Sequence, residues 1–293
     1  MIAFAIDTAT TLPEGTEEKF GVKIFRLGIP LYIDGKEYIE GRDITAEEFM
    51  TMYSPKSDLK TAVPSPGFIE EFFKNIYEEG YKEVIYFGIS TKLSGLTDSV
   101  KMVAKSFDDM KIHVINTKSV SFGAGFIVLK ALELFKNSYE IDKIVEISSD
   151  SFKNIRLLVS VMDLTRLMNG GRLPRYKGIV ANLLRIKPLL HITKNGELQL
   201  FQKTRTSNKL ISKMVDISIK HLESRKTNSK IAIGWGHERM EDYAFELKES
   251  IKNEINKIIG LVPEFITFSL PSILMCHTGL DVFGCVIYGE ISD

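Results

Sequence analysis

Val84-Ile85-Tyr86-Phe87-Gly88-Ile89 is the stretch from which the fold of this chain can be predicted. Its β-branched and aromatic side chains are typical of a buried strand. A hydroxyl-rich loop follows, and then Val100, Val103 and Phe107 recur at helical spacing. The next apolar run, Ile112–Ile115, again has the composition of a strand. Strand, helix and strand in this order predict a parallel βαβ unit with a right-handed crossover.

The same alternation continues on both sides of this unit. Ile2–Ile6 is a short apolar strand that ends at Asp7. Ser65-Pro66 is typical of a helix start, with serine as N-cap and proline at the first helical position. The helix that follows repeats apolar side chains every four residues and ends at Gly80; these side chains are Phe68, Phe72 and Ile76, and Phe73 and Tyr77. Another helix extends from Gly123-Ala124-Gly125 to near Phe135.

Residues 22–60 fit the alternation less well. Ile33–Tyr38 carries Asp34-Gly35 at its centre, which predicts a β-hairpin. Ile44–Tyr53 is a candidate short helix, with Thr45 and Glu48 at the spacing of a capping box.

The second half of the chain predicts another set of strands and helices. The expected helices are Asp163–Asn169, closed by Gly170-Gly171, then Val180–Ile186, Leu210–Leu222 and Glu241–Ile258. The expected strands are Leu189–Ile192 and Leu198–Gln202, joined by the turn Lys194-Asn195-Gly196, and Ile231–Gly234, Phe265–Phe268 and Cys285–Tyr288. We therefore expect an N-terminal α/β domain at residues 1–155 and a C-terminal α/β domain at residues 156–293. No linker composition marks this boundary, and the last strand is also compatible with a return to the first domain.

Composition excludes several classes of protein. The 293 residues include 38 Lys and Arg and 38 Asp and Glu, and this balance argues against a nucleic-acid partner. Cys276 and Cys285 are too few for a disulfide framework or a zinc site, so we expect reduced, buried thiols and neither metal nor cofactor. Met1–Asp7 has no signal-peptide pattern, and no stretch approaches the ~18 apolar residues of a membrane span. A cytoplasmic protein without stable membrane insertion is expected.

Three polar segments are candidates for ligand binding. Thr61–Pro66 combines two prolines with a helix start, although a simple capped loop is the more common interpretation. Ile89–Leu96 follows a parallel strand, where its hydroxyls and helix N–H groups can bind a carboxylate or a phosphate; an ordinary polar turn is as common. The third segment is Cys276–Gly279. Its His277 is of a type that is more often structural, yet it titrates near neutral pH and can match the charge of a bound acid.

Most catalytic motifs are absent from the sequence. Gly234-Trp235-Gly236 and Gly123-Ala124-Gly125 lack the third glycine of a dinucleotide-binding loop. There is no Gly-x-Ser-x-Gly elbow, Walker loop or His-Glu-x-x-His motif. The alternative that involves catalysis is a serine hydrolase of acyl esters, with Ser94 as nucleophile and His277 as base.

Taken together, seven segments resemble the bacterial DegV family. They occur in the family's order over essentially the whole chain, which makes the resemblance specific although each segment alone is weak. These segments are Ala5–Thr8, Pro30-Leu31 with Asp34–Tyr38, Thr61–Pro66, Ile89–Leu96, Gly170–Arg172, Lys187–Leu190 and His277–Gly279.

The resemblance implies a DegV-like α/β fold of two domains with a lipid site between them. It implies that a buried tunnel holds one long-chain fatty acid, and that Thr61, Ser94 and His277, with Gly95 and Thr278, contact its carboxylate. Similar proteins are carriers without catalytic activity of their own. A fatty-acid kinase catalytic subunit supplies ATP and metal and forms an acyl phosphate for phospholipid synthesis. Arg172 and Arg205 match positions associated with the carboxylate-side surface and with docking of that kinase.

The chain departs from the family pattern at three places. Ala62-Val63 replaces Ser/Thr-Gln, Leu96 replaces threonine, and Leu280-Asp281 replaces Pro-Gly. These changes leave Thr61, Ser94 and His277 in place but make the polar end of the expected site poorer in hydroxyl groups. A shift in ligand preference is the expected consequence.

Overall fold

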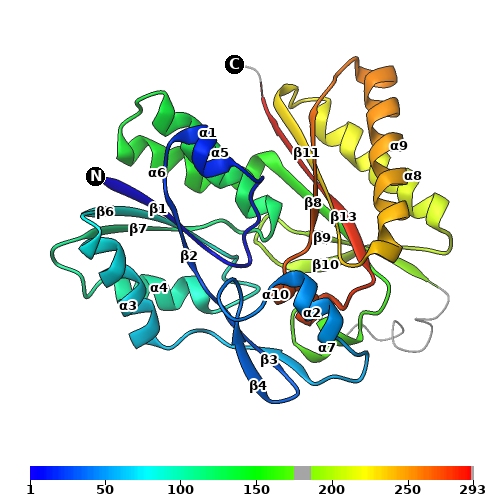
Figure 1. Ribbon diagram of the computed structural model, residues 1–293. Helices are drawn as coiled ribbons and strands as arrows, with labels where there is room; N and C mark the ends of the chain where they lie inside the picture. The colour runs from blue at the N-terminus through cyan, green and yellow to red at the C-terminus, as the bar shows by residue number, and fades with distance from the viewer. Residues whose placement is uncertain (175–185, 292–293) are drawn as a thin grey trace. The chain divides into compact units, whose positions relative to one another are not determined.

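The computed structural model describes residues 1–174 and 186–291, and these form two compact units (Figure 1). The first unit comprises Met1–Thr45, Lys56–Lys153 and Lys194–Gly196. The second comprises Ala46–Pro55, Asn154–Thr193 and Glu197–Asp293. The chain passes from the first unit to the second after Lys153. In addition, Ala46–Pro55 belongs to the second unit and Lys194–Gly196 to the first, unlike the residues on either side of them. The composition of the sequence does not indicate this division.

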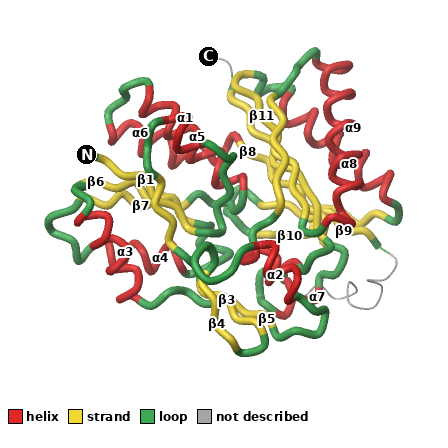
Figure 2. Tube along the Cα trace, in the orientation of Figure 1, coloured by secondary structure: helices red, strands yellow, loops and turns green. Residues whose placement is uncertain are grey.

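A parallel sheet with the strand order β2-β1-β6-β7 forms the centre of the first unit (Figure 2). The strands are β1 (Ile2–Asp7), β2 (Ile24–Leu27), β6 (Glu83–Gly88) and β7 (Lys111–Asn116). The helices are α1 (Thr16–Phe20), α3 (Pro66–Glu78), α4 (Leu96–Ala104), α5 (Phe122–Lys136) and α6 (Ile141–Asp150), followed by a 3₁₀ turn (Ser151–Asn154). Helices α3 and α4 cover one face of the sheet, and α1, α5 and α6 cover the other (Figure 1). The predicted parallel βαβ architecture is confirmed.

A small antiparallel sheet with the order β4-β3-β5 also belongs to the first unit. Its strands are β3 (Pro30–Ile33), β4 (Lys36–Ile39) and β5 (Leu59–Thr61). Asp34 and Gly35 have φ angles of 50° and 87°, so the hairpin turn has the left-handed backbone that matches strand twist. This confirms the hairpin expected at Ile33–Tyr38.

Helix α3 begins as its sequence predicts, and its buried row includes part of the expected apolar face. Ser65 Oγ accepts a hydrogen bond from the N–H of Phe68 at 3.2 Å, which is the expected N-cap. The fully buried row is Ile69, Phe73 and Ile76, whereas Phe68 and Phe72 are only partly buried. Of the residues expected on the apolar face, Phe73 and Ile76 are therefore fully buried. Ile69, which was not expected there, completes the buried row at the i, i+4, i+7 spacing and faces the sheet.

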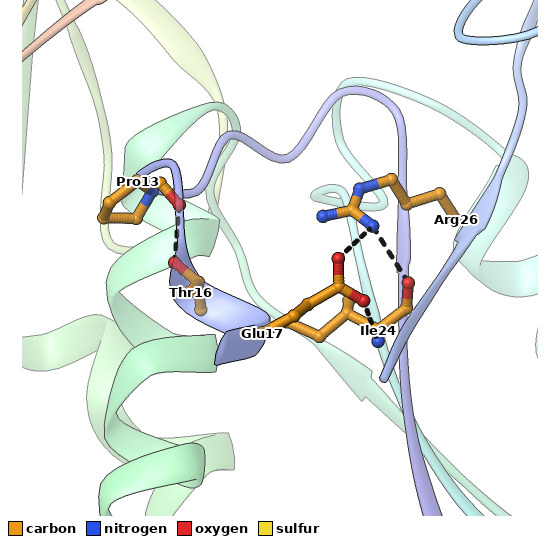
Figure 3. A network of polar contacts seen from close by, with 5 residues as sticks. All are labelled: Pro13, Thr16, Glu17, Ile24 and Arg26. Carbon is orange, nitrogen blue, oxygen red and sulfur yellow. Dashed lines mark hydrogen bonds and ion pairs between the residues drawn. The ribbon is translucent and has the colours of Figure 1, made fainter. Parts of the chain in front are cut away.

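A polar network fixes the connection from α1 to β2 (Figure 3). Thr16 Oγ1 donates to the carbonyl of Pro13 at 2.6 Å. Glu17 Oε1 accepts the backbone N–H of Ile24 at 2.6 Å, and Arg26 donates to both Glu17 Oε2 and the Ile24 carbonyl. These bonds satisfy backbone groups at the start of the edge strand β2, and they restrict the loop that follows β1.

The second unit contains a mixed sheet with the order β10-β9-β8-β13-β11-β12. Its strands are β8 (Ile155–Val161), β9 (Lys187–Ile192), β10 (Leu198–Thr204), β11 (Thr227–Trp235), β12 (Glu264–Ser269) and β13 (Val282–Glu290). Its helices are α2 (Ala46–Met52), α7 (Thr165–Asn169), α8 (Ser207–Leu222), α9 (Glu241–Ile259) and α10 (Ser272–Thr278), with a 3₁₀ turn at Glu238–Met240. Strands β11 and β12 are parallel, and the other pairs are antiparallel.

The last strand does not return to the first domain. β13 pairs with β8 on one side and with β11 on the other, and both neighbours belong to the second unit. Its buried, mainly apolar sequence suits this central position, where neighbouring strands use its hydrogen-bonding groups on both edges. The helix expected at Val180–Ile186 lies, except for its last residue, outside the described residues.

The core of the second unit lies between α8, α9 and one face of the sheet. Fully buried side chains from both helices pack together there with strand residues; among them are Leu210, Met214, Leu247, Ile251, Ile231 and Phe283. Cys276 and Cys285 are buried free thiols, as predicted. Within the described ranges, none of the helices combines the length and the apolar composition that a bilayer span requires.

Candidate functional site

The carboxyl edge of the parallel sheet is where the first unit can bind a ligand. Strands β1 and β6 are neighbours, but β1 leads to β2 on one side while β6 leads through α4 to β7 on the other. At such a point the two connections diverge, and α/β sheets bind ligands at the carboxyl ends of these strands. The loops that begin at Asp7 and at Ile89 meet at this edge.

Asp7 joins these two loops from inside the protein. Its Oδ2 accepts the N–H of Ile89 at 2.7 Å, and its Oδ1 accepts the N–H of Ala9 at 3.1 Å. The hydroxyls of Tyr86 and Thr10 lie at 3.4 Å from the same carboxylate. Complete burial raises the pKa of Asp7 to about 6, while the hydrogen bonds act in the opposite direction. The sequence analysis interpreted Asp7 as the end of a strand and did not predict that this carboxylate connects the two loops.

The Ser90–Gly95 loop is organised by its own hydroxyl groups. Ser90 Oγ donates to the carbonyl of Gly196 at 2.8 Å and accepts the N–H of Lys92 at 3.2 Å. Ser94 Oγ accepts the N–H of Leu96 at 3.2 Å, which places this hydroxyl at the start of α4. Free N–H groups and the helix dipole favour an anion at such a position.

The segment containing Thr61 lies beside this loop. Thr61 is the last residue of β5, where it pairs with Leu31. Two residues later, a methyl group of Val63 lies 3.8 Å from the point where a side chain at Gly95 would begin. Two of the three polar segments noted in the sequence are therefore brought together within the first unit.

The third polar segment forms the end of a helix in the second unit, a feature that the sequence did not predict. His277 and Thr278 are the last residues of α10. A side chain starting at Gly170 would meet His277 Nδ1 at 3.1 Å, and Arg172 Nη1 donates to the Gly170 carbonyl at 2.6 Å. His277, Gly170 and Arg172 therefore form one cluster, in which the Gly-Gly-Arg and His-Thr-Gly motifs meet.

His277 is neutral at pH 7 in this cluster. Burial, and secondly the positive charge of Arg172, lower the pKa of His277 to about 4. The sequence suggested that an imidazole titrating near neutral pH could match the charge of an acid. In the structure, a bound anion has to raise this pKa before His277 can carry a charge. Neutral or charged, the ring can donate one hydrogen bond.

Thr278 and Arg205 lie in different surroundings. Thr278 Oγ1 is directed back to its own helix end, with the carbonyls of Leu274 and Gly279 at 3.2 Å and 2.8 Å. Arg205 is exposed and precedes Thr206, the N-cap of α8. Neither residue has a contact that ties it to the His277 cluster, so their expected roles remain predictions.

Two further residues border the His277 cluster and were missed from the sequence. The Arg166 guanidinium lies over the ring of Tyr53, with its carbon 5.2 Å from the ring centre. A side chain at Gly279 would meet the Tyr53 hydroxyl at 3.1 Å. More than 100 residues separate Tyr53 from these partners, and α2 by itself carries no signal of where it packs.

The hydrolase alternative requires a base beside Ser94. The one histidine of the first unit, His113, contacts Glu83 at 2.8 Å, and Glu83 begins the strand that Ser94 follows. His113 is therefore at the amino end of β6, whereas Ser94 is beyond its carboxyl end. His113 therefore cannot be this base. The base that the sequence suggests for Ser94, His277, belongs to the second unit, and the hydrolase alternative stays a prediction.

Comparison with known proteins places the chain among characterised folds. A family model described as an uncharacterised protein of the DegV family matches residues 1–290. The DegV domain-containing protein SACOL1460 of Staphylococcus aureus (strain COL) is 29% identical over 259 residues, which cover 88% of this chain and 89% of the relative. The DegV domain-containing protein CA_C1624 of Clostridium acetobutylicum is 28% identical, with 98% of each chain covered.

Solved structures show the same architecture. The fatty acid binding DegV family protein SAG1342 from Streptococcus agalactiae superposes with a TM-score of 0.87 at 27% identity, covering 99% of both chains. A DegV family protein from Thermus thermophilus, described by its fatty acid binding, superposes with a TM-score of 0.85 at 23% identity, covering 98% of this chain and 99% of that one. At that lower identity the likeness establishes the fold alone.

Proposed function

This chain belongs to the DegV family, and from that premise we propose that it binds a long-chain fatty acid and presents the carboxylate to a fatty-acid kinase. The observation that carries the proposal is the likeness over nearly the full length to the S. agalactiae protein, which is described as fatty acid binding. Thr61, Ser94 and Gly95 in the first unit, and His277 and Thr278 in the second, are the proposed head-group residues.

The division of labour between tail and head follows from the energetics. Burial of a long acyl chain contributes about 0.8 kcal/mol per methylene, or about 12 kcal/mol in total before entropy and desolvation are subtracted. The tail therefore supplies most of the affinity. A carboxylate removed from water needs several donors, which the Ser94 hydroxyl, the N–H groups at the start of α4 and the His277 ring can provide.

The binding step is tested by native mass spectrometry of the protein purified from a bacterial host. We expect a co-purifying acid of a few hundred daltons that is released when the protein is denatured. Added oleic acid should raise the melting temperature, because a ligand that binds only the folded state stabilises it. A ligand-free mass together with no stabilisation by oleic acid would reject fatty-acid binding.

The presentation step depends on a partner, so the protein alone is expected to form no acyl phosphate. With the kinase subunit and ATP, the carboxylate attacks the γ-phosphoryl group, ADP leaves, and the acyl phosphate forms. Arg172 and Arg205 are the proposed docking residues for this partner. A cytoplasmic location and a role in phospholipid synthesis belong to the same proposal.

Ser94→Ala should affect the two steps unequally. We expect fatty-acid affinity to fall by about tenfold, because one hydrogen bond to a charged acceptor is lost while the tail contacts remain. Acyl phosphate formation at saturating fatty acid should fall by about a hundredfold, because the carboxylate is no longer held in orientation. Ser106→Ala is the matched control, because that hydroxyl donates only to the nearby carbonyl of Val103. Equal losses in both assays would contradict this division of labour.

A further inference from the structure

Tyr53 lies next to the cluster that His277, Gly170 and Arg172 form. It follows α2, whose Phe49 is completely buried, and it belongs with α2 to the second unit. Helix α10, which ends at His277 and Thr278, packs against both α2 and α7 (Figure 1). The chain segment that leaves β4 and returns to β5 thus brings a tyrosine to the end of α10.

Arg166 of α7 holds the Tyr53 ring in place. Its guanidinium lies over the ring at 5.2 Å, and Phe49 contacts the same ring at a centroid distance of 6.1 Å. Arg166 Nη2 also donates to the carbonyls of Ser54 and Pro55, at 3.1 Å and 2.9 Å. Arg166 therefore holds both the Tyr53 ring and the backbone that follows it, and this limits the positions that the Tyr53 hydroxyl can take.

The Tyr53 hydroxyl faces the turn that follows His277. A side chain at Gly279 would begin 3.1 Å from this hydroxyl, just as one at Gly170 would begin 3.1 Å from His277 Nδ1. At both positions glycine avoids a Cβ atom that would crowd the neighbouring polar group. In contrast to Thr278 Oγ1, which is directed to two backbone carbonyls, the Tyr53 hydroxyl forms no hydrogen bond with residues 1–174 or 186–291.

We infer that Tyr53 is a further head-group residue, whose hydroxyl donates to the same carboxylate that His277 contacts. This inference rests on the proposed fatty-acid binding. A carboxylate has about four acceptor positions, so another donor beside His277 can be used without displacing it.

The experiment compares an acid with its ester. Tyr53→Phe removes the hydroxyl and keeps the ring that Arg166 and Phe49 contact. We expect oleic acid to bind about tenfold more weakly to Tyr53→Phe than to the unchanged protein, because a hydrogen bond to a charged acceptor is lost. Methyl oleate, which has the same tail and a neutral head, should weaken by at most about threefold. Tyr139→Phe, at an exposed tyrosine of the first unit, should change neither affinity.

Spectroscopy separates the loss of a donor from a displaced helix. Without ligand, the His277 ring resonances should be the same in Tyr53→Phe and in the unchanged protein. Equal effects on acid and ester, no effect on either, or a shifted His277 would each overturn the inference while leaving fatty-acid binding intact. If the unchanged protein does not bind oleic acid, the proposed function itself fails, and this is seen before any variant is made.

Discussion

Gly125→Ala is expected to lower the free energy of unfolding by about 3 kcal/mol, although alanine is the better helix former. Gly125 lies in the first turn of α5, where the loop after β1 crosses the helix. A methyl group at this position would come within 2.0 Å of the Thr11 carbonyl oxygen and 3.2 Å of its carbon. Both are backbone atoms, so no change of rotamer can relieve the contact, and the loop itself must move.

Gly67→Ala is the matched control for this substitution. Gly67 lies in the first turn of α3, and a methyl group there would meet no atom within 4 Å. This variant should be as stable as the unchanged protein or gain up to about 1 kcal/mol. Urea denaturation of both variants gives the comparison. Similar stability of Gly125→Ala and Gly67→Ala would show that the loop after β1 does not pack on α5 as described.

The second large effect concerns the pH dependence of stability through Asp7. Its pKa is about 6 in the folded protein and 3.8 when the side chain is solvated, so the folded state binds the proton more tightly. The stability from this group is therefore complete below pH 3.8 and is lost as the pH rises through 6. The difference between the two pKa values is equivalent to about 3 kcal/mol of unfolding free energy.

Asp7→Asn isolates this contribution from all other titrating groups. Asparagine keeps the shape but presents an amide to either the Ile89 or the Ala9 N–H, so the variant should be less stable at every pH. The difference in unfolding free energy between the unchanged protein and Asp7→Asn should be largest near pH 3 and should shrink by about 3 kcal/mol by pH 7. Urea midpoints measured over this range provide the test. A gap that is constant with pH, or one that widens toward pH 7, would contradict the raised pKa of Asp7.

Local patterns explain why so many elements could be predicted. The cap at Ser65, the turn at Asp34-Gly35 and the apolar runs at β1, β6 and β7 depend on neighbours within a few residues. Alternation of such strands with helices then restricts the topology to a parallel sheet. The order of seven short motifs indicated the DegV family before any contact was known, and the family match over residues 1–290 confirms it.

The sequence analysis missed the ten-residue helix α6 and the seven-residue strand β8, although both have ordinary length. Other elements that escaped prediction have little local signal. β2 and α1 are short, and the seven-residue helix α10 is amphipathic over too few turns for its period to stand out. The expected apolar face of α3 contained Phe73 and Ile76 but not Ile69, because aromatic side chains at the edge of this face match a helical period almost as well. Only the position of the sheet decides between two adjacent faces of one helix.

The sequence alone determined the order and type of most elements, the parallel sheet of the first half, the family, and the polar segments at 61–66, 89–96 and 276–279. These properties follow from side-chain periods, turn chemistry and motif spacing, which act over short stretches of chain. Tertiary structure alone decided that α2 belongs to the second unit, that Tyr53 meets Arg166 and Gly279, and that Asp7 and His277 have pKa values of about 6 and about 4. Packing between distant segments sets both proximity and burial, and burial controls the energy of a charge.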